Sequence, residues 1–143
     1  MTKVKKFQDK VAVITGGASG IGLALARRFA RGGARLGLLD MDAEALQREA
    51  ARLAGGGTEV VAAVCDVSAR RDCQAGIDAV LGRFGRIDVL VNNAGITARD
   101  RFVDTRAEVF ERVMAVNFFG SLYCTQAALA SLRASRGLIV VVE

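Results

Sequence analysis

The chain has 143 residues, of which 52% are hydrophobic and 24% charged, a balance that excludes a disordered protein and suits one domain with a sizeable core. The net charge of +5 comes from arginines scattered over helix-like faces, so a solvated surface explains it better than nucleic-acid binding. There is no histidine, and the three cysteines lack C-x-x-C spacing. We therefore predict no metal site and expect reduced, packed thiols.

No membrane partner is predicted either. No apolar stretch approaches the length of a membrane span, and "VAVITGGASGIG" is broken by glycines. The basic head "MTKVKKFQDK" is not followed by the apolar core of a signal peptide. These observations predict a cytoplasmic protein.

The first half of the chain alternates short apolar runs with helical periodicity. Residues 10–17, KVAVITGG, predict a strand ending in glycines, and residues 34–40, ARLGLLD, predict a second strand. Between them, apolar residues at every fourth position predict an amphipathic helix over Gly20–Arg31. Asp42 is placed to cap a second helix, which the glycines at 55–57 end.

The second half repeats this alternation. Further strands are predicted at residues 58–67, 87–95 and 137–143. Ser68 is placed to cap the helix after the third strand, and Thr105 with Glu108 fits a capping box that opens a long helix reaching about residue 133. Apolar runs that do not alternate, separated by helices, predict an α/β fold with a parallel sheet covered on both faces.

The turn after the first strand, "TGGASGIG" at residues 15–22, is typical of a phosphate-binding loop. Gly16 can turn with positive φ, Gly20 leaves no side chain between backbone and phosphate, and Gly22 allows close packing of helix on strand. Free N–H groups at the helix start would face the phosphates. A plain structural turn is the alternative, but a strand before and a helix after favour phosphate binding.

The end of the second strand carries Asp40. A carboxylate there can accept both hydroxyls of an adenosine ribose and would repel a 2′-phosphate. Its neighbour Met41 is not basic, and Ala18 and Ser19 supply no cation. A helix-capping role for Asp40 is the alternative, although Asp42 is better placed for it. The pattern favours NAD over NADP as the cofactor.

Four motifs in order along the chain carry a resemblance to a known family. They are the T-G-x-x-x-G-x-G loop at residues 15–22, "DV" at 66–67, "NNAG" at 92–95, and Asn117 in "VMAVNFFG". The combination resembles the short-chain dehydrogenase/reductase family over nearly the whole chain. The resemblance implies a Rossmann-type doubly wound parallel sheet with strand order 3-2-1-4-5. It also implies hydride transfer between NAD and a small-molecule alcohol or carbonyl substrate.

The resemblance also implies roles for single residues. Asp66 would accept a hydrogen bond from the adenine amino group, with Val67 beside the ring, although Asp66 could instead cap the third helix. Ser19 and Ile21 would contact the pyrophosphate and ribose.

The two later motifs carry implied roles of the same kind. Asn93 would lie against the ribose with Ala94 and Gly95 beside it, and Asn92 would tie the central strands together, although both asparagines could merely form an Asx turn. Asn117 would bend the long helix and expose a carbonyl for a water in the proton relay. An asparagine inside a helix needs a polar partner in any case.

The family's catalytic Tyr, a Lys four residues later and a Ser all lie at or after the fifth strand. Here Tyr123 lies before that strand, Ala127 stands four residues on, and no lysine follows Lys10. We interpret Tyr123 as a packing residue. The resemblance implies that residues 1–143 are an incomplete NAD-binding domain, truncated after the fifth strand and inactive alone. The alternatives are a non-catalytic nucleotide-binding module or pseudoenzyme and, more distantly, a methyltransferase using S-adenosylmethionine.

The predicted fifth strand, residues 137–143, would be an apolar edge strand without proline. Strands four and five are expected to lack cover on the face of the first two helices. Such an edge predicts self-association or poor solubility. The resemblance separately implies a homo-oligomer that pairs through the long helix.

Overall fold

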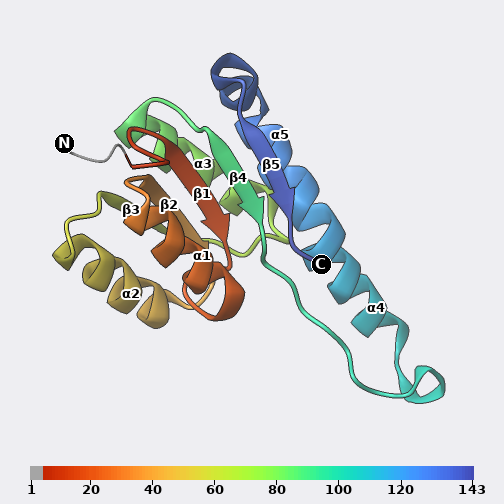
Figure 1. Cartoon of the computed structure of the whole chain (residues 1–143). Helices are drawn as coiled ribbons and strands as arrows, with labels where there is room; N and C mark the ends of the chain where they lie inside the picture. Colours follow the sequence, from red (N-terminus) through yellow and green to blue (C-terminus); the bar gives the residue numbers. More distant parts are fainter. Residues whose placement is uncertain (1–4) are drawn as a thin grey trace.

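The computed structural model describes residues 5–143. Five strands alternate with helices along the chain (Figure 1). The strands are β1 (Val11–Thr15), β2 (Arg35–Asp40), β3 (Val60–Val64), β4 (Val89–Asn92) and β5 (Leu138–Val141). The helices are α1 (Gly20–Arg31), α2 (Ala43–Gly55), α3 (Arg70–Phe84), α4 (Ala107–Met114) and α5 (Gly120–Ser135), with a short 3-10 turn η1 (Phe102–Asp104) and a π-helical turn η2 (Ala115–Phe119).

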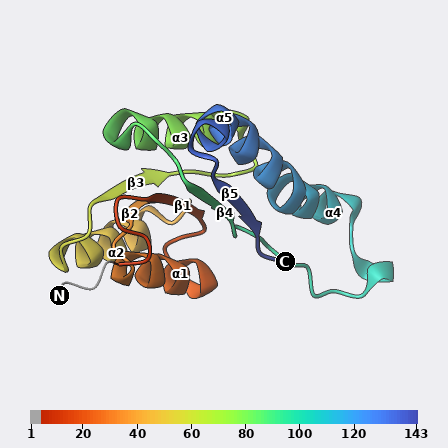
Figure 2. The same ribbon diagram turned by 45° about the horizontal axis from the view of Figure 1, so that its top comes forward.

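All five strands pair in parallel, in the order β3-β2-β1-β4-β5, which confirms the predicted topology. Figure 2 shows α1 and α2 on one face of the sheet and α3 and α5 on the other. Alternate residues of β1 therefore enter different cores. Ala12 and Ile14 pack under α1 and α2, whereas Val11 and Val13 pack under α3 and α5. Burial on both faces explains why the strand sequences are continuously apolar.

Two of the predicted helix caps were wrong. Asp42 does cap α2, because its carboxylate accepts the N–H of Ala45 at 3.0 Å. The N-cap of α3, however, is Ala69, and the Ser68 hydroxyl donates to Asp66 Oδ1 at 2.7 Å instead. The hydroxyl of Thr105 donates back to the carbonyl of Arg101, and α4 begins without a side-chain cap. In both cases a nearby acceptor competes with the helix for the hydroxyl.

The helical run from Ala107 to Ser135 has 29 residues, and its most apolar window has a mean hydropathy of 1.3. By length and composition it meets the requirement for a membrane span, so the prediction that no stretch approaches one was wrong. This is weak evidence for a membrane, since a core helix passes the same test. Within α5, Cys124, Ala128 and Leu132 are buried in the core shared with α3.

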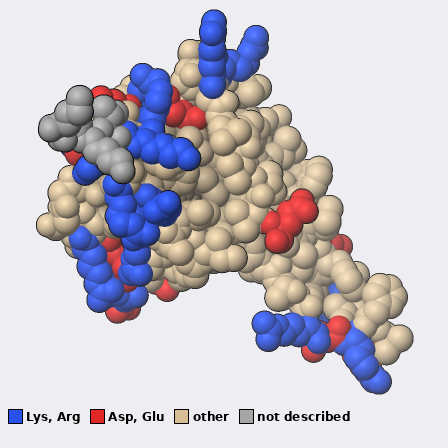
Figure 3. Space-filling view, viewed as in Figure 1, with Lys and Arg blue, Asp and Glu red and all other residues tan. Residues whose placement is uncertain are grey.

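The edge of the sheet at β5 is exposed, as predicted, with Leu138 59% and Val141 53% exposed. The expectation that β4 also lacks cover was wrong, because Val89 and Val91 are 9% and 1% exposed. They pack with β5 residues and with Ala18 and Ala26 of the α1 side. In Figure 3 the middle of the view, around β4 and β5, shows few charged side chains.

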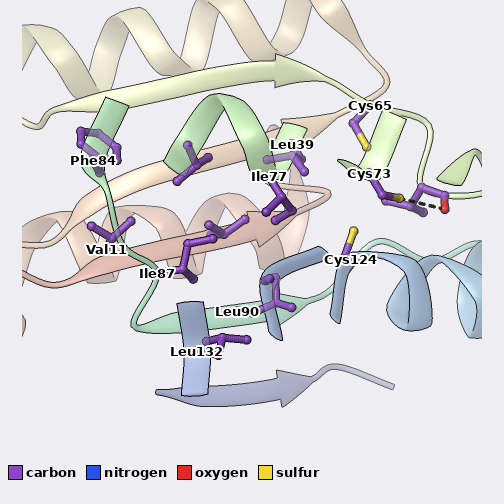
Figure 4. Packing of buried hydrophobic residues seen from close by; sticks show 14 of the residues in the cluster. Val11, Leu39, Cys65, Cys73, Ile77, Phe84, Ile87, Leu90, Cys124 and Leu132 are labelled. Carbon is purple, nitrogen blue, oxygen red and sulfur yellow. Dashed lines mark hydrogen bonds between the residues drawn. The ribbon is translucent and has the colours of Figure 1, made fainter. Parts of the chain in front are cut away.

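Three free thiols lie together between β3, α3 and α5 (Figure 4). Cys65, Cys73 and Cys124 are all buried, and Cys73 donates to the carbonyl of Val67 at 3.3 Å. Hydrogen bonding to Cys73 and burial raise the pKa of the Cys65 and Cys124 thiols. The cysteines are therefore packed and reduced, as the sequence predicts. Among residues 5–143, no group of three or more His, Cys, Asp or Glu side chains is arranged to hold a metal ion.

Candidate functional site

The candidate site lies at the carboxyl ends of β1, β2 and β3, beside the point where the strand order reverses. A cavity of about 350 Å³ opens there. Its lining includes each predicted cofactor residue except Gly22: Gly16, Ser19, Gly20, Ile21, Asp40, Met41, Asp66, Val67, Asn93, Ala94 and Gly95. It also includes four residues that the sequence reasoning missed: Cys65, Ile96, Arg112 and Val116.

The loop between β1 and α1 requires its glycines. Gly16 and Gly20 have φ of +63° and +51°, a region that side chains disfavour. A Cβ on Gly22 would lie 2.1 Å from the carbonyl oxygen of Gly16 and 2.5 Å from Asn93 Nδ2. A Cβ on Gly20 would meet nothing within 4 Å. The loop is thus packed tightly against β4 at Gly22 and is open at Gly20, as a cradle for a ligand must be.

Thr15 and Asn93 join this loop to the end of β4. The Thr15 hydroxyl oxygen accepts the N–H groups of Asn93 and Ala94, both at 3.0 Å. Asn93 Nδ2 donates to the carbonyls of Thr15 and Gly16 at 3.0 and 3.2 Å. Asn93 therefore bonds across the sheet rather than forming a local Asx turn. Thr15 belongs to the quoted motif, but only the structure shows that it supports Asn93.

Asp40 ends β2 at the rim of the cavity, between exposed Met41 and the glycine loop. Its Oδ2 accepts the N–H of Ala18 and its Oδ1 accepts the N–H of Asp42, each at 3.0 Å. The carboxylate is thus fixed by backbone, and each oxygen keeps further acceptor capacity. The side chain that caps α2 is Asp42, so the alternative capping role for Asp40 is not seen.

Asp66 lies just beyond the end of β3 and also lines the cavity. Its Oδ1 accepts both the N–H and the hydroxyl of Ser68, at 3.0 and 2.7 Å, and its Oδ2 lies 3.4 Å from Arg112 Nη2. The Ser68 bonds and the Arg112 charge hold the pKa of Asp66 below its usual value, against the opposing effect of burial. Val67 is buried beside it, packed against Gly120 of α5.

Asn117 lies in the π-helical turn, the kind of helix defect that recurs at functional sites. Its side chain accepts the N–H of Ile96 and donates to the carbonyl of Ile96, both at 2.9 Å. This is the polar partner that an asparagine in a helix needs. Its own carbonyl accepts the Ser121 hydroxyl at 3.3 Å. An adjoining cavity of about 640 Å³ is lined by Asn117, Ser121 and the end of β5.

Asn92 does not bond to a neighbouring strand through its side chain. Its Nδ2 donates to Thr125 of α5 at 3.1 Å, so it ties β4 to the covering helix rather than to the central strands. A further cavity of about 460 Å³, at the other end of the sheet, contains none of the predicted site residues. The candidate site is therefore the pair of adjoining cavities at the carboxyl ends of the strands.

Sequence comparison shows that the chain is similar to oxidoreductases. The 11-beta-hydroxysteroid dehydrogenase-like 6 of Arabidopsis thaliana is 46% identical over 136 residues, which cover 93% of this chain and 40% of that relative. The D-threitol dehydrogenase of Mycolicibacterium smegmatis is 38% identical over 136 residues, 94% of this chain and 52% of the relative.

Two solved structures share the fold. An alcohol dehydrogenase from Thermococcus sibiricus complexed with 5-hydroxy-NADP has a TM-score of 0.89 at 38% identity, covering 92% of this chain and 57% of that one. A short chain dehydrogenase/reductase from Burkholderia phymatum in complex with NAD has a TM-score of 0.91 at 36% identity, covering 95% and 49%. The chain therefore spans about half the length of these relatives. A family model for short chain dehydrogenases matches residues 10–143, and the chain belongs to that family.

Proposed function

We propose that this chain is the cofactor-binding part of an NAD-dependent oxidoreductase that acts on an alcohol or carbonyl group of a small molecule. The observation that carries the proposal is Asp40, held by two backbone N–H groups at the rim of the cavity that the glycine loop lines. A fixed carboxylate there accepts ribose hydroxyls and repels a 2′-phosphate. The two structural relatives contain NAD and an NADP derivative, so the preference for NAD rests on Asp40.

Different residues of the cavity would bind different parts of the dinucleotide. The glycine loop and the start of α1, with Ser19 and Ile21, would hold the pyrophosphate, since free helix N–H groups favour an anion. Asp66 and Val67 would hold the adenine. Asn93, with Ala94 and Gly95 beside it, would lie against the ribose. NAD, when bound, supplies the hydride acceptor, and the adjoining cavity beside Asn117 would receive the nicotinamide and substrate.

We further propose that residues 1–143 form a single incomplete domain that shows no turnover alone. Proton transfer in this family needs a tyrosine assisted by a lysine four residues on, and here Ala127 follows Tyr123 at that spacing. Tyr123 packs against the core, with Arg70 over its ring at 4.7 Å. This observation favours a non-catalytic nucleotide-binding module as the second candidate. A cytoplasmic location fits either function.

A homo-oligomer is the partner that the surface supports. Large apolar side chains are exposed along α4, η2 and α5: Phe110, Met114, Phe118, Phe119, Leu122 and Leu129. Burying them against a second copy would remove them from water. Light scattering should give a mass above 15.1 kDa for the purified chain, and a monodisperse monomer would contradict this part of the proposal.

Calorimetric titration tests the nucleotide assignment directly. We expect NADH to bind, NADPH to bind at least about tenfold more weakly because of the charge of Asp40, and S-adenosylmethionine not to bind. NADH oxidation or formation with alcohol and carbonyl substrates should be undetectable for this chain. Binding of S-adenosylmethionine without NADH would overturn the proposal, and turnover would contradict both the inactivity proposed for this chain and the non-catalytic alternative.

A further inference from the structure

Arg112 lines the Asp66 end of the cavity, although no sequence motif points to it. Its Nη1 donates to Ser68 Oγ at 2.7 Å, and its Nη2 lies 3.4 Å from Asp66 Oδ2. Ser68 in turn donates its hydroxyl and its N–H to Asp66 Oδ1. Asp66, Ser68 and Arg112 thus close a ring of hydrogen bonds, which we call the Asp66 clasp.

The clasp joins parts of the chain that are distant in sequence. Arg112 belongs to α4, which extends away from the body of the molecule (Figure 1), whereas Asp66 and Ser68 lie between β3 and α3. Among residues 5–143, the side-chain hydrogen bonds from α4 to another part of the fold all come from Arg112. The side chain is about half exposed, so its position is not imposed by burial.

The clasp leaves the two oxygens of Asp66 in different states. Oδ1 is occupied by two donors from Ser68, while Oδ2 has only the longer contact with Arg112. Oδ2 therefore keeps acceptor capacity for a ligand. An ionised carboxylate accepts hydrogen bonds but cannot donate them, so it pairs with an amino group and repels a carbonyl oxygen.

We propose that Arg112 is a positioning residue that acts through Asp66 to select adenine over a 6-oxopurine base in the bound dinucleotide. The inference rests on the proposed nucleotide function of the cavity. With Arg112 in place, the carboxylate is ionised and restrained, and it faces the base as an acceptor only. Without Arg112, Asp66 loses its cationic partner and can rotate about its side-chain bonds. Its Oδ2 is then no longer held as an acceptor toward the 6-amino group, so the preference should weaken.

The test compares two ligands on the same protein. Calorimetry measures Kd for NADH and for reduced nicotinamide hypoxanthine dinucleotide, in which a 6-oxo group replaces the 6-amino group. We expect the wild type to prefer NADH by about tenfold or more, as for a hydrogen bond to a charged group. The preference should fall below about threefold in Arg112→Met and be partly retained in Arg112→Lys, which keeps the charge.

Arg106→Met is the matched control, because it removes the same charge from the residue that precedes α4. Among residues 5–143, the hydrogen bond and ion pair of the Arg106 side chain are with Glu108 alone. Its preference for NADH should equal that of the wild type. A general loosening of the site would weaken the binding of both ligands equally and leave the ratio of their Kd values unchanged. The ratio therefore distinguishes a positioning role of Arg112 from a purely structural one.

An unchanged ratio of the two Kd values in Arg112→Met, with NADH still bound, would overturn this inference but leave the proposed nucleotide function intact. Stronger NADH binding by that variant would do so too, since it would mean that the guanidinium occupies the place of the base. If Arg112→Met does not fold, Ser68→Ala, which removes the bridging hydroxyl, must lower the ratio instead. A wild type that binds both dinucleotides equally would refute the contact with Asp66, and one that binds neither would refute the proposed function itself.

Discussion

The glycine-loop end of the sheet and the β5 edge differ in how far their side chains are buried and bonded within this chain. At the loop, Thr15 is 2% exposed and its hydroxyl serves the N–H groups of Asn93 and Ala94. At the edge, Leu138 and Val141 remain more than half exposed. The loop that lines the candidate cavity is therefore held by hydrogen bonds within this chain, whereas β5 and the α4–α5 surface carry apolar area that residues 5–143 do not cover. Changes at the first region should cost stability, and changes at the second should alter association.

The largest effect is expected at Gly22. In Gly22→Ala the new Cβ would meet the backbone oxygen of Gly16 at 2.1 Å, so the loop must move. We expect a loss of about 3 kcal/mol in unfolding free energy, measured by chemical denaturation, together with loss of NADH binding. Gly82→Ala is the control, because a Cβ in that α3 position meets nothing within 4 Å. It should be neutral or stabilising by about 0.5 kcal/mol. Equal effects of the two changes would contradict the packing described for the loop.

The next largest loss of stability is expected for Thr15→Val. The variant keeps the shape of the side chain but leaves the partly buried N–H groups of Asn93 and Ala94 without their acceptor. A loss of about 2–3 kcal/mol in unfolding free energy is expected. Thr97→Val, at an exposed position, should change stability by less than about 0.5 kcal/mol. A harmless Thr15→Val would mean that the hydroxyl does not hold β4 to the loop.

The amino ends of the same strands offer a pH-dependent comparison. Burial raises the pKa of Asp88, but Arg86, the N–H of Val11 and Lys10 together hold it below its usual value. Because the folded-state pKa is lowered, this stabilisation is present above about pH 3.9, the value for the unfolded chain, and is lost as the pH falls through the folded-state pKa. Asp88→Asn should therefore lose about 2 kcal/mol near neutral pH.

The measurement for Asp88 is a series of urea denaturations from neutral to acidic pH. The difference in unfolding free energy between the wild type and Asp88→Asn should shrink as the pH falls below about 4. A difference that stays constant with pH would show that the charge of Asp88 contributes nothing.

The smallest effect on stability is expected at the edge. Leu138 is 59% exposed, so Leu138→Lys should change the unfolding free energy by less than about 0.5 kcal/mol. It should nevertheless reduce self-association, because a charge on an edge strand opposes pairing with another chain. Analytical ultracentrifugation of both proteins measures the association. Undiminished association of Leu138→Lys would mean that the chain does not pair through the β5 edge, and would favour the α4–α5 surface instead.

Much of the fold could be predicted because local patterns and topology rules agree. Apolar runs in the strands, glycines after β1 and the cap at Asp42 each act over a few residues, and parallel crossovers then restrict the strand order. The caps at Ser68 and Thr105 failed because each hydroxyl has a competing acceptor that a helix pattern does not reveal. The cover over β4 was missed because it depends on packing across the sheet.

The residues of the candidate site also could be predicted only in part. Residues with a local signal, such as Asp40 at the end of a predicted strand and Asn93 in the "NNAG" motif, were predicted and line one cavity. Arg112 could not be predicted, since its side chain reaches Asp66 from α4 by a contact between positions 46 residues apart, which no local motif encodes. The length of the helical run from Ala107 to Ser135 was predicted closely, but its mean hydropathy of 1.3 over the most apolar window was missed, because its apolar residues are interrupted by polar ones in the sequence.

We propose that Asp40 makes this cavity an NAD site. The chain contains no tryptophan, so calorimetry is the suitable readout for the affinities of NADH and NADPH with the wild type and Asp40→Asn. We expect the wild type to prefer NADH by at least about tenfold and Asp40→Asn to lose most of this preference, because the repulsion of the 2′-phosphate is gone. An equal preference in both proteins, or a wild type that prefers NADPH, would contradict it.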